Sequence, residues 1–173
     1  MSRYPLLANG TQAATINAAA VLTAQVIKAK GIPEAFDWAD VCIFMLIGAF
    51  VITPLILRVL IGRIFRLGLA KGPLLAVCTL FGMFVVNAAF HVSFGVLYQL
   101  LSPQGQGVAG VNVGALVAGL FTRAFLSGAL KSRLVFFPAD VANTFVVPLL
   151  YQPLVANLAG FLYTVILALG LAA

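Results

Sequence analysis

Charged residues are the scarcest feature of this sequence. Only 8% of its 173 residues are charged, 63% are hydrophobic, and the mean hydropathy is +1.14. A soluble domain carries about 25% charged residues, so this chain lacks the polar side chains that would cover a surface exposed to water. The composition predicts an integral membrane protein. The length suits one compact helical bundle and leaves no room for a soluble catalytic domain.

Enzyme motifs are missing as well. The chain has one His and four carboxylates, and it contains no GxSxG, HExxH, GxxxxGK[ST] or GxGxxG motif. Its two cysteines, Cys42 and Cys78, lie inside apolar runs, where a free thiol behaves as a small hydrophobe. They form neither a CxxC nor a Cys/His cluster. We therefore expect a protein that is not an enzyme, has no metal site and binds no cofactor other than lipid.

The net charge of +6 raises the question of nucleic-acid binding. The basic residues, however, lie singly at the ends of apolar runs, which is how cations flank membrane spans and contact lipid headgroups. Arg58, Arg63, Arg66 and Lys71 follow the second apolar run and are assigned to the headgroup region. We expect membrane lipids as partners and no nucleic acid.

The apolar runs predict four transmembrane helices, because about 20 residues cross the hydrocarbon core. We expect spans at about residues 6–29, 41–61, 74–101 and 154–171, and extra helical segments at 108–134 and 138–147. The alternation typical of barrel strands is absent. The predicted fold class is therefore all-α, a single multi-pass bundle with a short interfacial or re-entrant helical segment before the last span.

The apolar stretch 108–122 is rich in glycine and short for a span. If it crossed the bilayer, most basic residues would fall on one side, which the positive-inside rule favours. Its length argues against a crossing. The sequence leaves this point, and the side on which the termini lie, open.

The stretch FFPADVANTFVVPLLYQP interrupts the last apolar region with three prolines and several polar side chains. One helix from Pro138 through the final apolar run would be about 50 Å long, which exceeds the roughly 30 Å hydrocarbon core. We predict a short interfacial helix that starts at Pro138 and is ended by Pro148. The final span then has Pro153 in its first turn, and Asn143 bonds a backbone group that the break sets free.

Asn87 and His91 are the main polar residues of the third span, and their i, i+4 spacing places them on one helix face. One hypothesis is a polar stripe that lines a solute path or a proton relay. The other is hydrogen bonding between helices. We favour the second, because the span contains no acidic residue to act as a partner of His91 in a relay.

In the last third of the chain, Asn143 and Pro148 are followed by Gln152 and Tyr163. This order resembles the closing signature of the Mpv-seventeen and twenty-two-kilodalton peroxisomal membrane protein family, which is roughly N-F-x-x-V-P, an Arg, and then W-N-x-Y-L-S. Gln152 stands in place of the family's Arg, and Tyr163 in place of its Trp. Pro138, after a Phe, is similar to the family's Trp-Pro.

Two earlier stretches are also similar to family motifs, the P-L … A-Q of the first helix and the D-W … G … G-P of the second. The residues that carry this similarity are Pro5, Gln25, Asp37, Trp38, Gly48 and Pro54. The sequence departs from the family at Ala20-Val21, where Gly-Asp is common, and at Leu57–Val59, where a His/Tyr/Trp cluster is usual. No Asp-Gln pair opens the third helix. The residues that shape the backbone are kept, whereas polar and aromatic groups suited to a pore are lost.

The resemblance implies a multi-pass protein of an organellar membrane, with the mitochondrial inner membrane favoured over the peroxisome. Family members are described as small-solute channels or as proteins that support organelle homeostasis. Because the pore-like polar groups are lost here, we favour a helix-packing accessory or structural subunit that contacts other membrane-protein subunits. A channel for small solutes is the alternative.

Overall fold

The computed structural model describes residues 5–102, 104–105 and 107–168, and the regular structure within them is helical, with no strand. The predicted all-α class is confirmed. In chain order the elements are α1 (Pro5–Lys28), α2 (Trp38–Leu46), the π-helical η1 (Ile47–Ile52) and η2 (Leu55–Ile61), the 3₁₀ turn η3 (Ile64–Arg66), α3 (Lys71–Leu80), the π-helical η4 (Phe81–Val86), α4 (Asn87–Leu101), the 3₁₀ turn η5 (Val108–Gly110), α5 (Val113–Gly119), α6 (Arg123–Phe145) and α7 (Gln152–Ala168).

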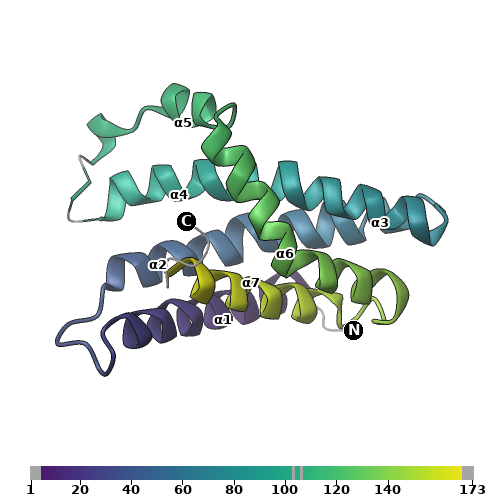
Figure 1. Ribbon diagram of the computed structural model, residues 1–173, viewed down its shortest axis with the longest axis horizontal. Coiled ribbons are helices and arrows are strands. Elements are labelled where there is room, and N and C mark those ends of the chain that lie inside the picture. Colours follow the sequence, from purple (N-terminus) through teal and green to yellow (C-terminus); the bar gives the residue numbers. More distant parts are fainter. Residues whose placement is uncertain (1–4, 103, 106, 169–173) are drawn as a thin grey trace.

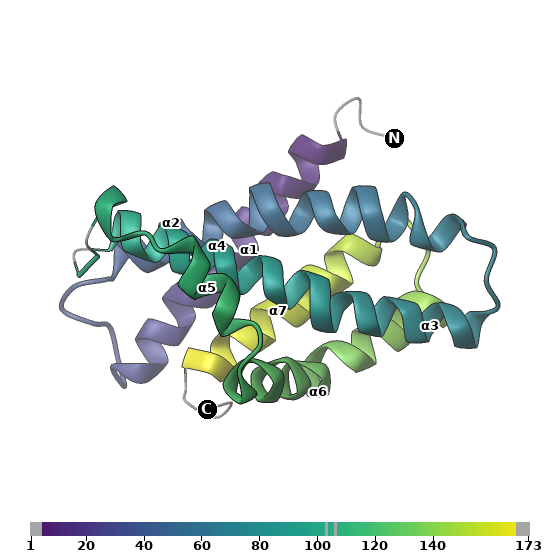
Figure 2. The ribbon, with the colours of Figure 1, turned by 90° about the horizontal axis from the view of Figure 1, so that it is seen from above.

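The helices run back and forth along the long axis of the molecule (Figures 1 and 2). The first helix, α3–α4 and the last helix run in one direction, while α2–η2 and α6 run in the opposite direction. The most extensive helix contact joins α1 and α7, and α6 packs on both α7 and α3. The short α5 lies over α4, away from α1 and α7 (Figure 1).

Two helices are long and apolar enough to cross a membrane. They are Trp38–Arg66, with 29 residues, and Lys71–Leu101, with 31 residues. The spans predicted at 41–61 and 74–101 lie inside them. Helices α5 and α6, bent by 62° relative to each other, make a third candidate if they count as one span. The chain is therefore a membrane protein with two or three such helices among its described residues, fewer than the four predicted.

The two remaining predicted spans correspond to helices that fall short of this criterion. The helix α1 has the length, but its Asn, Thr and Gln side chains lower its hydropathy. Two of these side chains are satisfied within the helix, because the Thr11 hydroxyl donates to the Leu7 carbonyl at 2.9 Å and Thr15 to Thr11 at 3.0 Å. The apolar part of α7, Gln152–Ile166, is shorter than a span. Residues 169–171 of the predicted last span lie outside the described residues.

The helix α6 overturns the prediction of a separate helix at 138–147. It is continuous from Arg123 to Phe145, with Pro138 inside it. A proline in a helix removes one backbone hydrogen bond and crowds the preceding turn, but membrane helices tolerate this where neighbouring groups compensate. The predicted short segment before the last span is thus a 23-residue helix.

The helical segment predicted at 108–134 is divided by the bend between α5 and α6. At this bend the Thr122 hydroxyl donates to the Gly119 carbonyl at 2.7 Å and accepts from the Phe125 N–H at 3.2 Å. Both contacts satisfy backbone groups that a helix end leaves free. The cap at Thr122 therefore ends one helix and begins the next.

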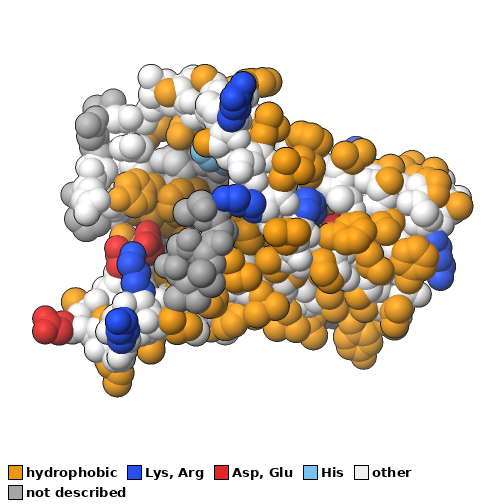
Figure 3. Space-filling model, viewed as in Figure 1, with side chains coloured by type: hydrophobic (Ala, Val, Ile, Leu, Met, Phe, Trp, Pro, Cys, Tyr) orange, Lys and Arg blue, Asp and Glu red, His pale blue; other side chains and the backbone are white. Residues whose placement is uncertain are grey.

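Much of the outer surface is apolar. Hydrophobic side chains cover most of the face in Figure 3, and acidic side chains gather at its left end, by the loop that joins α1 to α2. Large side chains such as Phe121 and Leu134 are 84% and 80% exposed. A soluble monomer rarely exposes so large an apolar surface, whereas a helical bundle in lipid does so throughout.

Candidate solute-binding cavity

A cavity of about 480 Å³ lies between the helices and is lined by residues of each α-helix in the described part of the chain. Its volume falls within the range of small-molecule sites, roughly 300–1,000 Å³. Most of the lining is apolar, but ten polar or charged residues also face it, namely Asn17, Asn87, His91, Thr122, Arg133, Asp140, Asn143, Asn157, Tyr163 and Thr164. The cavity thus brings together polar side chains from several helices.

The charged centre of the cavity is the ion pair of Arg133 and Asp140. The Arg133 Nη1 and Asp140 Oδ2 atoms are 3.2 Å apart, and the two side chains are only 12% and 19% exposed. Seven residues make two turns, so both residues lie on one face of α6. The guanidinium also lies 5.2 Å from the ring centroid of Phe136, a distance suited to a cation–π contact.

Sequence reasoning missed this pair. A helix that starts at Pro138, as predicted from the sequence, would separate Asp140 from Arg133. The signal was present, because two opposite charges stood seven residues apart in an apolar stretch. Continuity of the helix through Pro138 is what brings them together.

A glycine on a neighbouring helix makes room for the guanidinium. A Cβ atom at Gly82, in η4, would lie 2.6 Å from Arg133 Nη1, which is closer than real Cβ contacts allow. The helix is π-helical at this point, and such turns are frequent at functional sites. Gly82 therefore permits α6 to approach the α3–α4 helix at the ion pair.

Asn87 and His91 both line the cavity, but the structure gives them different contacts. Asn87 Nδ2 donates to the Ser132 hydroxyl of α6 at 3.0 Å and to the Met83 carbonyl at 3.2 Å. The predicted hydrogen bonding between helices is therefore confirmed for Asn87. The His91 ring lies edge-on to Phe125, with the ring centroids 5.7 Å apart.

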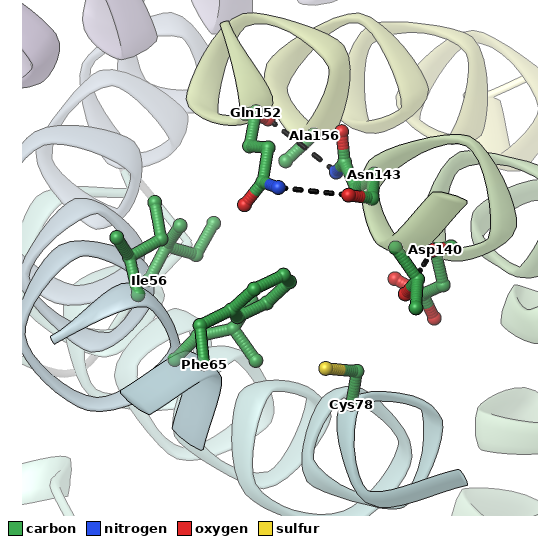
Figure 4. A pocket seen from close by; sticks show the side chains of 10 residues that line it. Ile56, Phe65, Cys78, Asp140, Asn143, Gln152 and Ala156 are labelled. Atoms are coloured by element: carbon green, nitrogen blue, oxygen red, sulfur yellow. Dashed lines mark hydrogen bonds between the residues drawn. The ribbon is translucent and has the colours of Figure 1, made fainter. Parts of the chain in front are cut away.

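The α6–α7 corner closes one end of the cavity, and the predicted break at Pro148 is confirmed, because α6 ends at Phe145 and α7 begins at Gln152. Gln152 Nε2 donates to the Asn143 carbonyl at 2.7 Å and to the Val147 carbonyl at 3.3 Å. Asn143 Nδ2 makes only a longer contact of 3.5 Å to the carbonyl of Gln152, the first residue of α7, so the side chain that bonds the carbonyls freed by the break is that of Gln152 and not, as predicted, that of Asn143 (Figure 4). Pro153 is in the first turn of α7, as predicted.

A small pocket of about 10 Å³ opens beside this corner and shares Cys78, Asp140 and Asn143 with the larger cavity. Figure 4 shows the side-chain oxygen of Gln152 directed into the pocket and away from Asn143. This Gln152 Oε1 and the Asn143 Oδ1 are buried and have no hydrogen-bond partner among the described residues. Arg133 Nε is also buried and also lacks a hydrogen-bond partner among the described residues.

Several residues of the family-like motifs contact one another at the start of α2. Gln25 Nε2 donates to the Asp37 carbonyl at 3.1 Å, and the Asp37 N–H donates to Gln25 Oε1 at 2.9 Å. Asp37 Oδ1 in turn accepts from the Asp40 N–H at 3.1 Å and caps α2. Trp38, the first residue of α2, is 62% exposed and packs on Phe36, with ring centroids 5.8 Å apart. These contacts hold the α1–α2 loop.

The other motif residues are spread along the helices. Pro5 is the first residue of α1, and Pro54 lies between the π-helical segments η1 and η2. A Cβ atom at Gly48 would collide with Asn17 of α1. The Tyr163 ring lies 5.5 Å from that of Phe136, centroid to centroid. Of these four residues, Gly48 and Tyr163 thus mediate contacts between helices.

The four cations assigned to headgroups are all exposed. They follow one another from η2 to the start of α3, at the end of the molecule where these elements meet (Figure 1). Lys71 Nζ lies 5.5 Å from the ring centroid of Phe145. Their position fits the headgroup region.

Comparison with models of protein families, with characterised proteins and with solved structures finds no match. The family resemblance therefore remains a prediction that rests on the motifs. The described residues also contain no group of three or more His, Cys, Asp or Glu side chains that could hold a metal ion.

Proposed function

We propose that this protein provides a path for small polar solutes across a membrane. The observation that carries the proposal is the interior cavity of about 480 Å³ with the Arg133–Asp140 pair in its lining. Ionisable groups inside a membrane are costly and mark solute or ion pathways. This is the alternative that sequence reasoning placed second to an accessory subunit.

The proposal includes membrane crossings by α1, by α7 and by the α5–α6 pair around the cavity, in addition to those of the two long apolar helices. Asn17 of α1 and Thr164 of α7 line it together with residues of the two long apolar helices. We propose that α1 and α7, which pack on each other, cross the bilayer as a pair, so that the cavity lies at the depth of the hydrocarbon core. The mitochondrial inner membrane is proposed on the family resemblance alone.

The test is solute flux into liposomes that contain the purified protein, with a matched pair of glycine variants. An added Cβ atom at either Gly128 or Gly72 has nothing within 4 Å, but only Gly128 lines the cavity. Gly128→Trp is expected to reduce urea flux at least fivefold by filling the cavity, whereas Gly72→Trp leaves the flux unchanged. Equal urea flux with both variants would contradict the proposal. So would a urea flux with the unmodified protein that does not exceed the flux into liposomes without protein.

Two further variants address the polar lining. Asn87→Leu removes the bond to Ser132, and His91→Leu leaves Phe125 without its ring contact. Both exchange a polar side chain in the cavity for an apolar one, so both are expected to slow flux. If flux is unaffected by either change, the solute does not pass this part of the lining.

An accessory subunit is the second candidate. The observation that favours it is an outward apolar stripe on α6, formed by Leu126, Leu130, Leu134 and Phe137, which are 42%, 58%, 80% and 45% exposed. Such a stripe fits another membrane helix as well as lipid. Native gels of the membrane in mild detergent test this: stoichiometric migration with a larger complex supports the subunit, and migration alone or as a homo-oligomer excludes it.

A further inference from the structure

The unpartnered polar atoms near the ion pair suggest what the cavity holds, if the proposed function is correct. Among the described residues, Arg133 Nε is a donor without an acceptor, and Asn143 Oδ1 and Gln152 Oε1 are acceptors without a donor. Gln152 is only 5% exposed, and its side-chain oxygen is directed into the small pocket (Figure 4). A buried polar group without a partner is costly. These groups therefore call for an occupant that offers both an acceptor and N–H donors.

The charges restrict the occupant further. Because Arg133 and Asp140 lie 3.2 Å apart, their charges cancel at a distance. A small anion that approached Arg133 would be repelled by the neighbouring Asp140, and a small cation would be repelled by Arg133. An occupant with adjacent positive and negative groups and no net charge would meet an opposite charge at each end.

The adjacency of the protein's charges matches one class of solute. In an α-amino acid the carboxylate and the ammonium group are attached to the same carbon atom, so they lie side by side like the Arg133 guanidinium and the Asp140 carboxylate. The ammonium group can donate three hydrogen bonds, and Asp140 and Gln152 line the small pocket, into which the Gln152 side-chain oxygen is directed (Figure 4). The carboxylate would accept from Arg133 Nε, in a charge-assisted bond.

The rest of the lining is apolar at this point. Ile56, Cys78 and Ala156 line both the small pocket and the larger cavity. They leave an aliphatic surface for the occupant's side chain and offer it no further charge. We propose that the cavity and the small pocket beside it bind a small aliphatic α-amino acid in its zwitterionic form, with the carboxylate at Arg133 in the cavity and the ammonium group at Asp140 and Gln152 in the pocket.

The first experiment measures binding to the purified full-length protein in mild detergent, by the shift of its melting temperature. The probes are alanine, acetate, methylammonium and acetamide, each at the same concentration and ionic strength. Alanine is expected to raise the melting temperature in a saturable way, and the other three to have no effect. Protection by acetate alone, by methylammonium alone, or by acetamide as strongly as by alanine would overturn the proposal, as would no protection by any probe.

Two variants locate the binding site. Arg133→Lys keeps the charge but removes Nε, and it is expected to raise the dissociation constant for alanine at least about tenfold, the effect of losing one charge-assisted bond. Replacing both members of the pair, Arg133→Leu with Asp140→Leu, removes the charges without leaving one unpaired and is expected to abolish binding. Circular dichroism and the melting temperature without probe check that each variant folds. Unchanged alanine binding in a folded variant would overturn the proposal.

Liposome flux separates this inference from the proposed function. If Gly128→Trp blocks urea flux but the protein does not bind alanine, the proposed amino-acid site is wrong and the proposed solute path is supported. If the protein binds alanine but carries no flux of any solute, the proposed solute path is wrong and the proposed amino-acid site is supported.

Discussion

Asn17 and Gly48 show how single residues set the distance between helices in this bundle. Asn17 Nδ2, on α1, donates to the Phe44 carbonyl of α2 at 3.2 Å, and Gly48 faces the same amide group. Between membrane helices there is little hydrophobic driving force, so close packing at small residues and polar contacts carry the association. The glycine allows the approach that the hydrogen bond requires.

The Gly48→Ala variant is expected to unfold more easily, by about 0.5–1.5 kcal/mol, the net worth of one hydrogen bond. Its Cβ atom would displace the Asn17 amide from the Phe44 carbonyl. The measurement is the free energy of unfolding in detergent micelles.

In an Asn17→Ala background, Gly48→Ala is expected to lower the free energy of unfolding by less, because the amide group that its Cβ atom would displace is absent. Gly72→Ala is the control, since a Cβ atom there meets nothing within 4 Å. Additive effects of Asn17→Ala and Gly48→Ala would show that the collision with Asn17 is not the cause.

At the scale of the element, α6 shows that two prolines in one segment act differently. Pro138 lies within the helix, whereas Pro148 lies in the turn between Phe145 and Gln152. The backbone at the turn is satisfied by the Gln152 side chain, so the chain can leave the helix there. Before Pro138 the Thr122 cap has already started a helix, and 15 residues of it precede the proline.

Pro138→Ala is expected to keep the fold and to raise the free energy of unfolding by about 1–3 kcal/mol, because proline inside a helix forfeits a hydrogen bond and crowds the preceding turn. Thermal unfolding followed by circular dichroism measures the change. Pro148→Ala is the matched comparison and is expected to bring no such gain, since its residue lies outside the helices. A clear loss of stability in Pro138→Ala would mean that the proline fixes a bend the protein needs.

At the scale of the whole molecule, the helix directions determine which loops share a side. The loops after α1 and after α4 lie at one end of the bundle, and the loops after η3 and after α6 lie at the other (Figures 1 and 2). The two long apolar helices account for the first two changes of side. Whether α5 and α6 cross decides the side of the last loop.

Single cysteines in these loops test the arrangement, in a background with Cys42→Ala and Cys78→Ala. With a membrane-impermeant maleimide, Gly31→Cys and Gln104→Cys are expected to be labelled from one side, and Leu69→Cys from the other. Leu150→Cys, at an exposed position of the α6–α7 turn, is expected to label with Leu69→Cys. If it labels with Gln104→Cys instead, the α5–α6 pair does not cross, and the arrangement of membrane crossings proposed around the cavity is wrong.

The sequence by itself determined the membrane class, the all-helical fold, the two long spans and the break at Pro148. These follow from composition, from run length and from backbone chemistry, which act over a few residues at a time. The tertiary structure alone decided that α6 continues through Pro138, that Arg133 reaches Asp140, and that ten polar residues from separate helices face one cavity. The cost of one missing helical hydrogen bond depends on the packing around it, and the packing depends on residues far away in the chain. The sequence therefore showed two opposite charges seven residues apart, but not that one helix brings them together in a cavity.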